Sequence, residues 1–163
     1  MVKDILRKQF DTCYDENSWF VAVRNALDGV PAEEAVWKPA GADNSIWQTV
    51  AHLSYYNGAY LLRFKGIDYE YDTADNDATF RGGDADDARW KAELERFDAT
   101  MTEWRELPKA ADESKFDQAV PQKAERKWWE LLADINAHNA YHGGQILLVR
   151  KLHGTWDREK GVS

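Results

Sequence analysis

The chain has one cysteine, no long apolar run and fewer basic than acidic residues among its 163 residues. The lone Cys13 excludes an intrachain disulfide framework. Lysine and arginine number 21 against 29 aspartate and glutamate residues, a formal net charge of −8, which argues against nucleic acid and against an anionic membrane surface as partners. No apolar run approaches a bilayer span, and the N-terminal residues lack the apolar core of a secretion signal. We therefore expect a cytoplasmic protein that binds neither nucleic acid nor membrane.

What the chain does contain is typical of one folded domain. Hydrophobic residues make up 44% and charged residues 31% of the sequence, which separates it from disordered chains. The length fits a single domain spanning residues 1–163 with a substantial core.

The negative charge is concentrated in residues 68–87, which hold eight acidic residues and one basic residue, Arg81. A calcium loop of the EF-hand type is excluded because its glycine and closing glutamate are missing from the required places. We interpret the segment as a solvated acidic loop.

Helical periodicity dominates the rest of the chain, and strand signals are scarce. Four amphipathic helices predict an all-α protein with the architecture of a four-helix bundle. Two connections are long enough to permit crossovers. The expected helices run from Leu6 to Leu27, from Ser45 to about Phe64, from after Asp84 to Pro108, and from about Ala124 to His153 before Gly154.

The last expected helix has polar residues in the middle of its buried stripe. Burying these without partners costs several kcal/mol, so something inside the bundle must satisfy them. The stripe, at steps of four and three, consists of Leu131, Ile135, His138, His142, Gln145, Val149 and Leu152.

His138 and His142 lie one helical turn apart on one face, a spacing that lets two imidazoles bind one metal ion. Of the other two histidines, His52 lies in the middle of the second expected helix, whereas His153 lies at a helix end. We therefore expect His52 as the third ligand. The alternative is a buried hydrogen-bond network of three histidines without metal. Gly143 and Gly144 indicate that a backbone or a ligand approaches closely there.

Two segments resemble a known family. The run Ile135–Ile146 (INAHNAYHGGQI) and the segment Ser45–Leu53 (SIWQTVAHL) are similar to the signature motifs of the DinB-like (YfiT-type) family of metal-dependent four-helix-bundle proteins. The resemblance implies up-down-down-up helix order, frequently a homodimer, and a divalent metal ion held by residues matching His52, His138 and His142. The acidic segment at 68–87 is not a feature of every member.

Three neutral nitrogen ligands leave open positions on an ion, as in catalytic rather than structural sites. Such an ion activates a water for hydrolysis or lowers the pKa of a thiol cosubstrate. The resemblance implies thiol transfer, and hydrolysis competes with it; both act on a small molecule. The alternative is a non-catalytic protein in which the ion is structural or sensed. Zinc, nickel and iron all accept imidazole.

Several residues are candidates for supporting roles. Gln145 and Tyr56 lie one turn beyond His142 and His52 and either orient a ligand, a water or a metal-bound group, or make ordinary core or pocket hydrogen bonds. In the first helix, Asn17 is a candidate partner for a histidine or makes ordinary core hydrogen bonds. Cys13 is either a small buried residue, or a fourth ligand or nucleophile. Asp134, four residues before His138, either reaches it or faces solvent. The eight tryptophans suit a dimer interface, an apolar substrate mouth or burial under loops.

Overall fold

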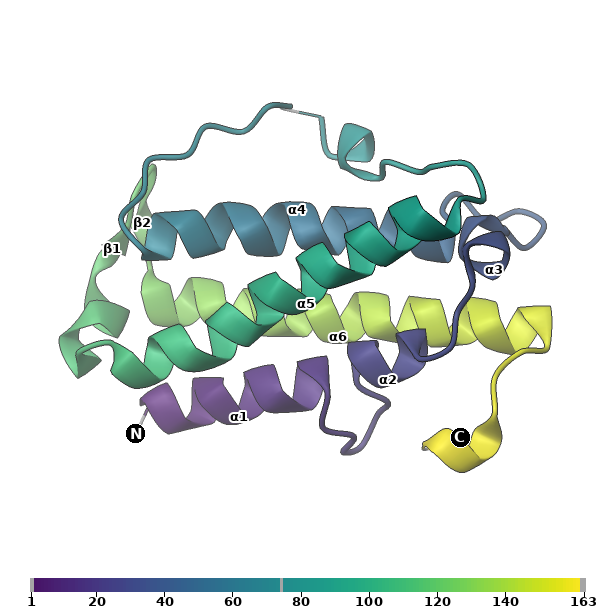
Figure 1. Ribbon diagram of the computed structural model, residues 1–163. Helices are drawn as coiled ribbons and strands as arrows, with labels where there is room; N and C mark the ends of the chain where they lie inside the picture. Colours follow the sequence, from purple (N-terminus) through teal and green to yellow (C-terminus); the bar gives the residue numbers. More distant parts are fainter. Residues whose placement is uncertain (1, 74, 162–163) are drawn as a thin grey trace.

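Four long helices run side by side in the computed structural model, which describes residues 2–73 and 75–161 (Figure 1). The expected all-α four-helix bundle is confirmed. The long helices are α1 (Val2–Tyr14), α4 (Ile46–Phe64), α5 (Asp87–Ala110) and α6 (Trp128–His153). Two short helices, α2 (Val23–Leu27) and α3 (Ala32–Val36), precede α4. The remaining elements are the 3-10 helices η1 (Asp77–Thr79), η2 (Glu113–Asp117) and η3 (Arg158–Lys160) and the strands β1 (Ala119–Val120) and β2 (Lys123–Lys127).

The helices follow the order up-down-down-up. Helices α1 and α6 run in one direction, and α4 and α5 run in the other (Figure 1). Because α4 and α5 are parallel neighbours, residues 65–86 must carry the chain back along the length of α4. We call this segment the crossover.

Aromatic side chains from all four long helices fill the core. Phe10 of α1 stacks on Trp104 of α5, with ring centroids 5.4 Å apart. Phe64 of α4 meets Trp128 of α6 edge to face at 5.0 Å. The Phe64 ring centroid also lies 5.5 Å from that of Trp104. Together these contacts tie the four helices to one another at the end of the bundle away from α3.

The tryptophans divide between burial and exposure. Trp37 and Trp156 are half-buried, Trp129 is 40% exposed, and Trp19 is 95% exposed. The four others lie in the core: Trp47, Trp90, Trp104 and Trp128.

One polar pair fixes how α4 and α6 face each other within the core. The side-chain amides of Asn57 and Asn139 exchange hydrogen bonds of 2.8 and 3.1 Å. Both residues are buried, so sliding one helix past the other would leave amide groups unsatisfied. The pair therefore holds the two histidine-bearing helices at one relative position.

The first expected helix is interrupted, so the prediction of one helix from Leu6 to Leu27 is wrong. Helix α1 ends at Tyr14, and α2 begins at Val23. Between them, the Asn17 side-chain oxygen accepts hydrogen bonds from the backbone nitrogen of Ala22 (3.0 Å) and from the amide of Asn25 (2.8 Å). Side chains of this type compete with helical backbone hydrogen bonds, which explains the break.

The start of the last helix also differs from the prediction. Residues 123–127 form β2, which pairs antiparallel with β1 around a turn at Pro121 and Gln122. Gln122 has a φ of 65°, a left-handed conformation that ends any helical course. Because residues 123–127 are extended in β2, helix α6 begins at Trp128 rather than near Ala124. Helix α5 ends two residues beyond Pro108, within the usual uncertainty of a helix end.

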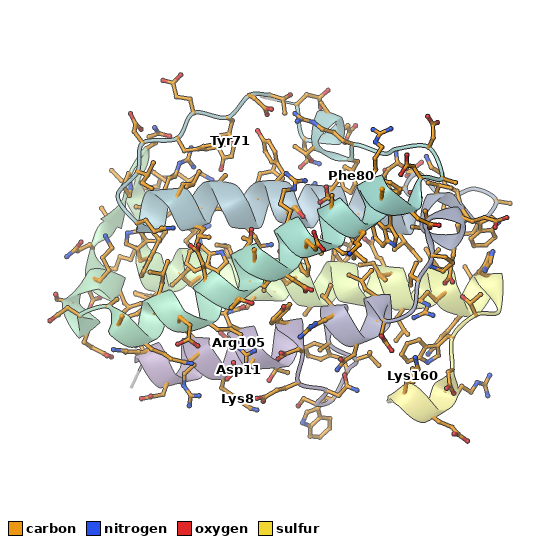
Figure 2. The ribbon with its side chains drawn as sticks, viewed as in Figure 1. Lys8, Asp11, Tyr71, Phe80, Arg105 and Lys160 are labelled. Atoms are coloured by element: carbon orange, nitrogen blue, oxygen red, sulfur yellow. The ribbon has the colours of Figure 1, made fainter. Side chains whose placement is uncertain are left out.

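The crossover is fastened to the first turns of α4. Gln48 donates from its side chain to the Phe80 carbonyl at 3.2 Å. A Cβ placed on Gly82 or Gly83 would lie 3.0 Å from the side chain of Gln48 or Trp47, respectively, so the chain passes closely over the helix here. Figure 2 shows Tyr71 and Phe80 on this segment, on the α4 side of the bundle.

Within the described residues, no helix combines the length and the apolar character needed to cross a bilayer.

Candidate metal centre

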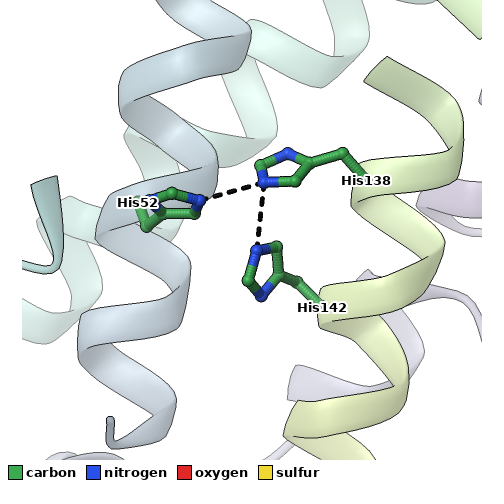
Figure 3. A group of neighbouring side chains, drawn as sticks. All are labelled: His52, His138 and His142. Atoms are coloured by element: carbon green, nitrogen blue, oxygen red, sulfur yellow. Dashed lines mark hydrogen bonds between the residues drawn. The ribbon is translucent and has the colours of Figure 1, made fainter. Parts of the chain in front are cut away.

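Three imidazoles converge between α4 and α6. His52 extends from α4 toward His138 and His142 of α6 (Figure 3). His138 Nε2 lies 2.9 Å from His52 Nε2 and 3.0 Å from His142 Nε2. One ligand atom from each residue lies within 4.8 Å of the others. Nitrogen atoms bound to one tetrahedral zinc ion lie about 3.3 Å apart, given bonds of roughly 2.0–2.1 Å. The expected convergence is therefore present, and its spacing is compatible with metal binding.

Hydrogen bonds behind the rings favour the protonation state that a metal requires. His142 Nδ1 lies 2.6 Å from Gln145 Oε1, and an amide oxygen can only accept, so Nδ1 carries the proton and Nε2 offers a lone pair. The Gln145 amide nitrogen in turn donates to the Tyr141 hydroxyl at 3.0 Å. Metal-binding histidines are commonly held in this way.

His52 has a similar partner in Thr79 of the crossover. The Thr79 hydroxyl lies 2.6 Å from His52 Nδ1 and donates to the Asn76 carbonyl, also at 2.6 Å. Because its single proton goes to that carbonyl, the hydroxyl accepts from Nδ1 and leaves the His52 Nε2 lone pair facing the cluster. Phe80 stacks on the same ring at a centroid distance of 3.9 Å.

Thr79 and Phe80 are site residues that the sequence did not reveal. Both lie in the segment interpreted as a solvated acidic loop, and nothing in its charge pattern distinguishes them. Most of the segment is exposed, but Thr79 is buried and Phe80 half-buried. The segment is therefore solvated on one side only, and its other side covers His52.

Burial and mutual repulsion keep the imidazoles neutral. Burial, with the charges of the other two histidines, lowers the pKa of His52 to about 3. Burial and the charge of His142 lower the pKa of His138 to about 4. Burial also lowers the pKa of His142, although the hydrogen bond to Gln145 opposes the shift. Neutral imidazole is the form that binds a metal ion.

The other candidates lie in different relations to the cluster. The Tyr56 ring meets the His52 ring edge to face at 5.0 Å, and its hydroxyl donates to Asn76 Oδ1 at 3.1 Å. Asp134 has a 64% exposed side chain and pairs with Arg126 at 2.7 Å. His153, as expected, is remote from the cluster: it is exposed and contacts Trp37.

Neither candidate in α1 and its connection to α2 contacts the histidine cluster, and Cys13 is the small buried residue that was one of its two alternatives. Asn17 contacts Ala22, Asn25 and the Lys160 carbonyl rather than a histidine. Cys13 is buried, donates to the Asn136 carbonyl at 3.2 Å, and lies outside the cluster as a small core residue. Burial raises the pKa of its thiol to about 11, so it is a poor nucleophile at neutral pH.

The two glycines after His142 have different surroundings. A Cβ on Gly143 would lie 3.0 Å from the Val23 side chain, so α2 approaches α6 closely there. Gly144 has open space around it. The close approach predicted from this pair is thus the packing of the Val23 side chain against Gly143.

A cavity of about 280 Å³ opens beside His138, between α4, the crossover and the β2 end of α6. Tyr56 and Ile135 contribute to its walls. A larger hollow of about 560 Å³ lies between α1 and α6 and includes Cys13, but it contains none of the three histidines. We regard the smaller cavity as the relevant one because it adjoins the cluster.

Fold and site together define a helical bundle with a three-histidine cluster, suited to a metal ion, between two of its helices. The sequence model of the DinB superfamily matches residues 18–146, a range that contains all three histidines. The chain belongs to this superfamily. Comparison with curated proteins and with solved structures gave no match.

Proposed function

We propose that His52, His138 and His142 bind a divalent metal ion, and that the protein is a metal-dependent enzyme acting on a small molecule by thiol transfer or hydrolysis. The observation that carries the proposal is the convergence of three Nε2 atoms beside a cavity. Zinc, nickel and iron are the candidate ions because all accept imidazole. The expected homodimer and the cytoplasmic location stay predictions.

The chain's own residues prepare this chemistry. Thr79 and Gln145 orient the imidazoles, and Phe80 shields one ring from water. Tyr56 and His138 both line the cavity, so a molecule bound there lies next to the cluster. When bound, a divalent ion supplies Lewis acidity, which makes a water or a thiol more acidic.

A non-catalytic protein with a structural or sensed ion is the second candidate. A structural site has a fourth protein ligand and no adjoining cavity. Here the metal-capable grouping among the described residues has three members, and His138 lines a cavity. These two observations support the enzyme.

Metal analysis of the purified protein tests the proposal first. We expect about one divalent ion per chain in the wild type, and loss of the ion in His52→Ala, His138→Ala and His142→Ala. His153→Ala, which removes an exposed histidine, should keep it. Unchanged metal content in all three cluster variants would eliminate both candidate functions.

Turnover then separates the two candidates. The metal-loaded protein is assayed on a panel of electrophiles, with and without low-molecular-weight thiols. Thiol-dependent product indicates transfer, and thiol-independent product indicates hydrolysis. A large fall in melting temperature on chelation, without turnover in either arm, indicates a structural ion.

A further inference from the structure

The cavity beside His138 has basic side chains at the end formed by the β1–β2 hairpin. Lys123 and Arg126 of β2 line the cavity together with Tyr60 of α4 and Asp134 of α6. The protein as a whole carries a net charge of −8, so two cations in one small cavity stand out from their surroundings.

Arg126 and Lys123 differ in whether a carboxylate pairs with them. Arg126 is neutralised by Asp134, at 2.7 Å. Lys123 donates to the Tyr60 hydroxyl at 2.7 Å, and no carboxylate among the described residues lies within ion-pair distance of it. An ammonium group has three donors, so Lys123 retains capacity to bind an anion.

Arg63 adds positive charge behind this end of the cavity. It is 3% exposed, and its guanidinium donates to the neutral groups Tyr71 Oη (3.0 Å), the Tyr69 carbonyl (3.1 Å) and Gln122 Oε1 (2.7 Å). Its Nε has no hydrogen-bond partner. A buried cation without a counter-ion is costly.

The positive groups of Arg63 and Lys123 both lie close to the ring of Tyr60. The Arg63 guanidinium carbon and Lys123 Nζ each lie 5.4 Å from the centre of the Tyr60 ring. The acidic group connected to them is Asp68, which is exposed and accepts from the Gln122 amide at 3.2 Å rather than from either cation. Two cations that have no carboxylate partner among the described residues therefore lie close to Tyr60, and an anion bound there would compensate Arg63 as well as Lys123.

We propose that the substrate or cosubstrate of this site is a small molecule with a carboxylate, which Lys123 contacts while the reacting end of the molecule faces the histidine cluster. This inference rests on the proposed function, because it names the substrate class of the same site. Lys123 is then a specificity-determining residue that acts through charge at a distance from the cluster.

Two probes that differ only in charge test the inference. The zinc-loaded protein is titrated by calorimetry with 3-mercaptopropanoate and with its neutral amide, 3-mercaptopropanamide. We expect the wild type to prefer the carboxylate by about tenfold, the usual size of one charge-assisted hydrogen bond. Lys123→Gln should abolish this preference by weakening carboxylate binding alone, and Lys123→Arg should retain most of it.

Matched controls separate this contact from general electrostatics and from the metal. Lys91→Gln removes the same charge from the exposed surface of α5 and should keep the preference. All variants should keep the wild-type zinc content, since none alters a histidine. Equal affinity for the two probes in the wild type, or an unchanged preference in Lys123→Gln, would overturn the inference while leaving the metal site intact.

A metal-free arm keeps the two proposals distinguishable. Glutarate and glutaramide, which lack a thiol, are compared by ligand-observed NMR on the chelator-treated protein. Preference for glutarate that disappears in Lys123→Gln supports the carboxylate contact even if the protein takes up no zinc. Absence of that preference counts against the contact whatever the zinc content.

Discussion

Hydrogen bonds outside the histidine cluster decide which imidazole nitrogen faces it. Gln145 and Thr79 each hold an Nδ1 at 2.6 Å. Without them, an imidazole is free to present either nitrogen or to turn away. The sequence predicted Gln145 because it follows His142 by one helical turn, but no local spacing connects Thr79 with His52, 27 residues before it.

Removal of the Gln145 amide should weaken metal binding without unfolding the protein. In Gln145→Ala, His142 Nδ1 loses its acceptor, and we expect the dissociation constant for zinc to rise about 10- to 100-fold. Gln145 is exposed, so the melting temperature of the metal-free protein should change little. Competition with a chromogenic chelator measures the affinity. Gln9→Ala, an exposed position on α1, is the control, and equal zinc affinities in both variants would contradict the role given to Gln145.

At the scale of whole elements, helix ends with a local signal were predictable. Helix α4 begins at a capping box formed by Ser45 and Gln48, and α6 ends at Gly154 with a φ of 84°. The ends of α1 and the start of α6 depend instead on Asn17 and on the β1–β2 hairpin. Both depend on hydrogen bonds between residues that helical periodicity does not register. The predicted helices therefore ran through these two positions.

The C-terminal part of α6 shows the same limit. The periodic stripe placed Leu152 inside, but Leu152 is 60% exposed and Arg150 is 5% exposed. Arg150 pairs with Glu34 of α3 at 3.0 Å and donates to the carbonyls of Ala26 and Asp28. A buried ion pair thus joins α2, α3 and α6, and charged residues at such positions give no hydrophobic signal.

Breaking this pair from one side should be strongly destabilising. Arg150→Met leaves the Glu34 carboxylate buried without its partner, and we expect the free energy of unfolding to fall by about 3–5 kcal/mol. The double variant Glu34→Leu with Arg150→Met removes both charges and should recover part of the loss. Urea unfolding measures the free energy of unfolding of the single and the double variant. Lys151→Met, at an exposed neighbouring position, is the control. A double variant less stable than Arg150→Met would show that the pair's charges are not the cause.

At the scale of the whole molecule, the parallel arrangement of α4 and α5 builds one wall of the site. Because these helices point the same way, the chain must return along α4 (Figure 1). This return brings Thr79 and Phe80 onto His52. Composition predicted the polarity of the crossover but not its covering role, since its path depends on the order of the helices. The same order places the β1–β2 hairpin at the far end of the cavity, where Lys123 lies.

The buried imidazoles should make the metal-free protein sensitive to acid at the level of global unfolding. The pKa values of His52 and His138 are about 3 and about 4 in the folded state, against about 6.5 in an unfolded chain. Below pH 6.5 the unfolded chain binds protons that the folded protein does not, so stability present at pH 7 is lost as the pH falls toward 4. We expect the free energy of unfolding to drop by about 1 kcal/mol per pH unit for each such histidine.

The fall of the free energy of unfolding with decreasing pH is caused by the buried histidines only if removing one of them makes that fall less steep. Urea unfolding of the chelator-treated protein at several pH values between 7 and 4.5 gives the slope for each variant. His52→Gln should flatten the dependence, because one neutral buried imidazole is gone, whereas His153→Gln, at an exposed position, should keep the wild-type slope. Carboxylates that titrate in the same range contribute equally to both variants, so their difference isolates the imidazole. Identical slopes in the two variants would mean that protonation elsewhere unfolds the bundle.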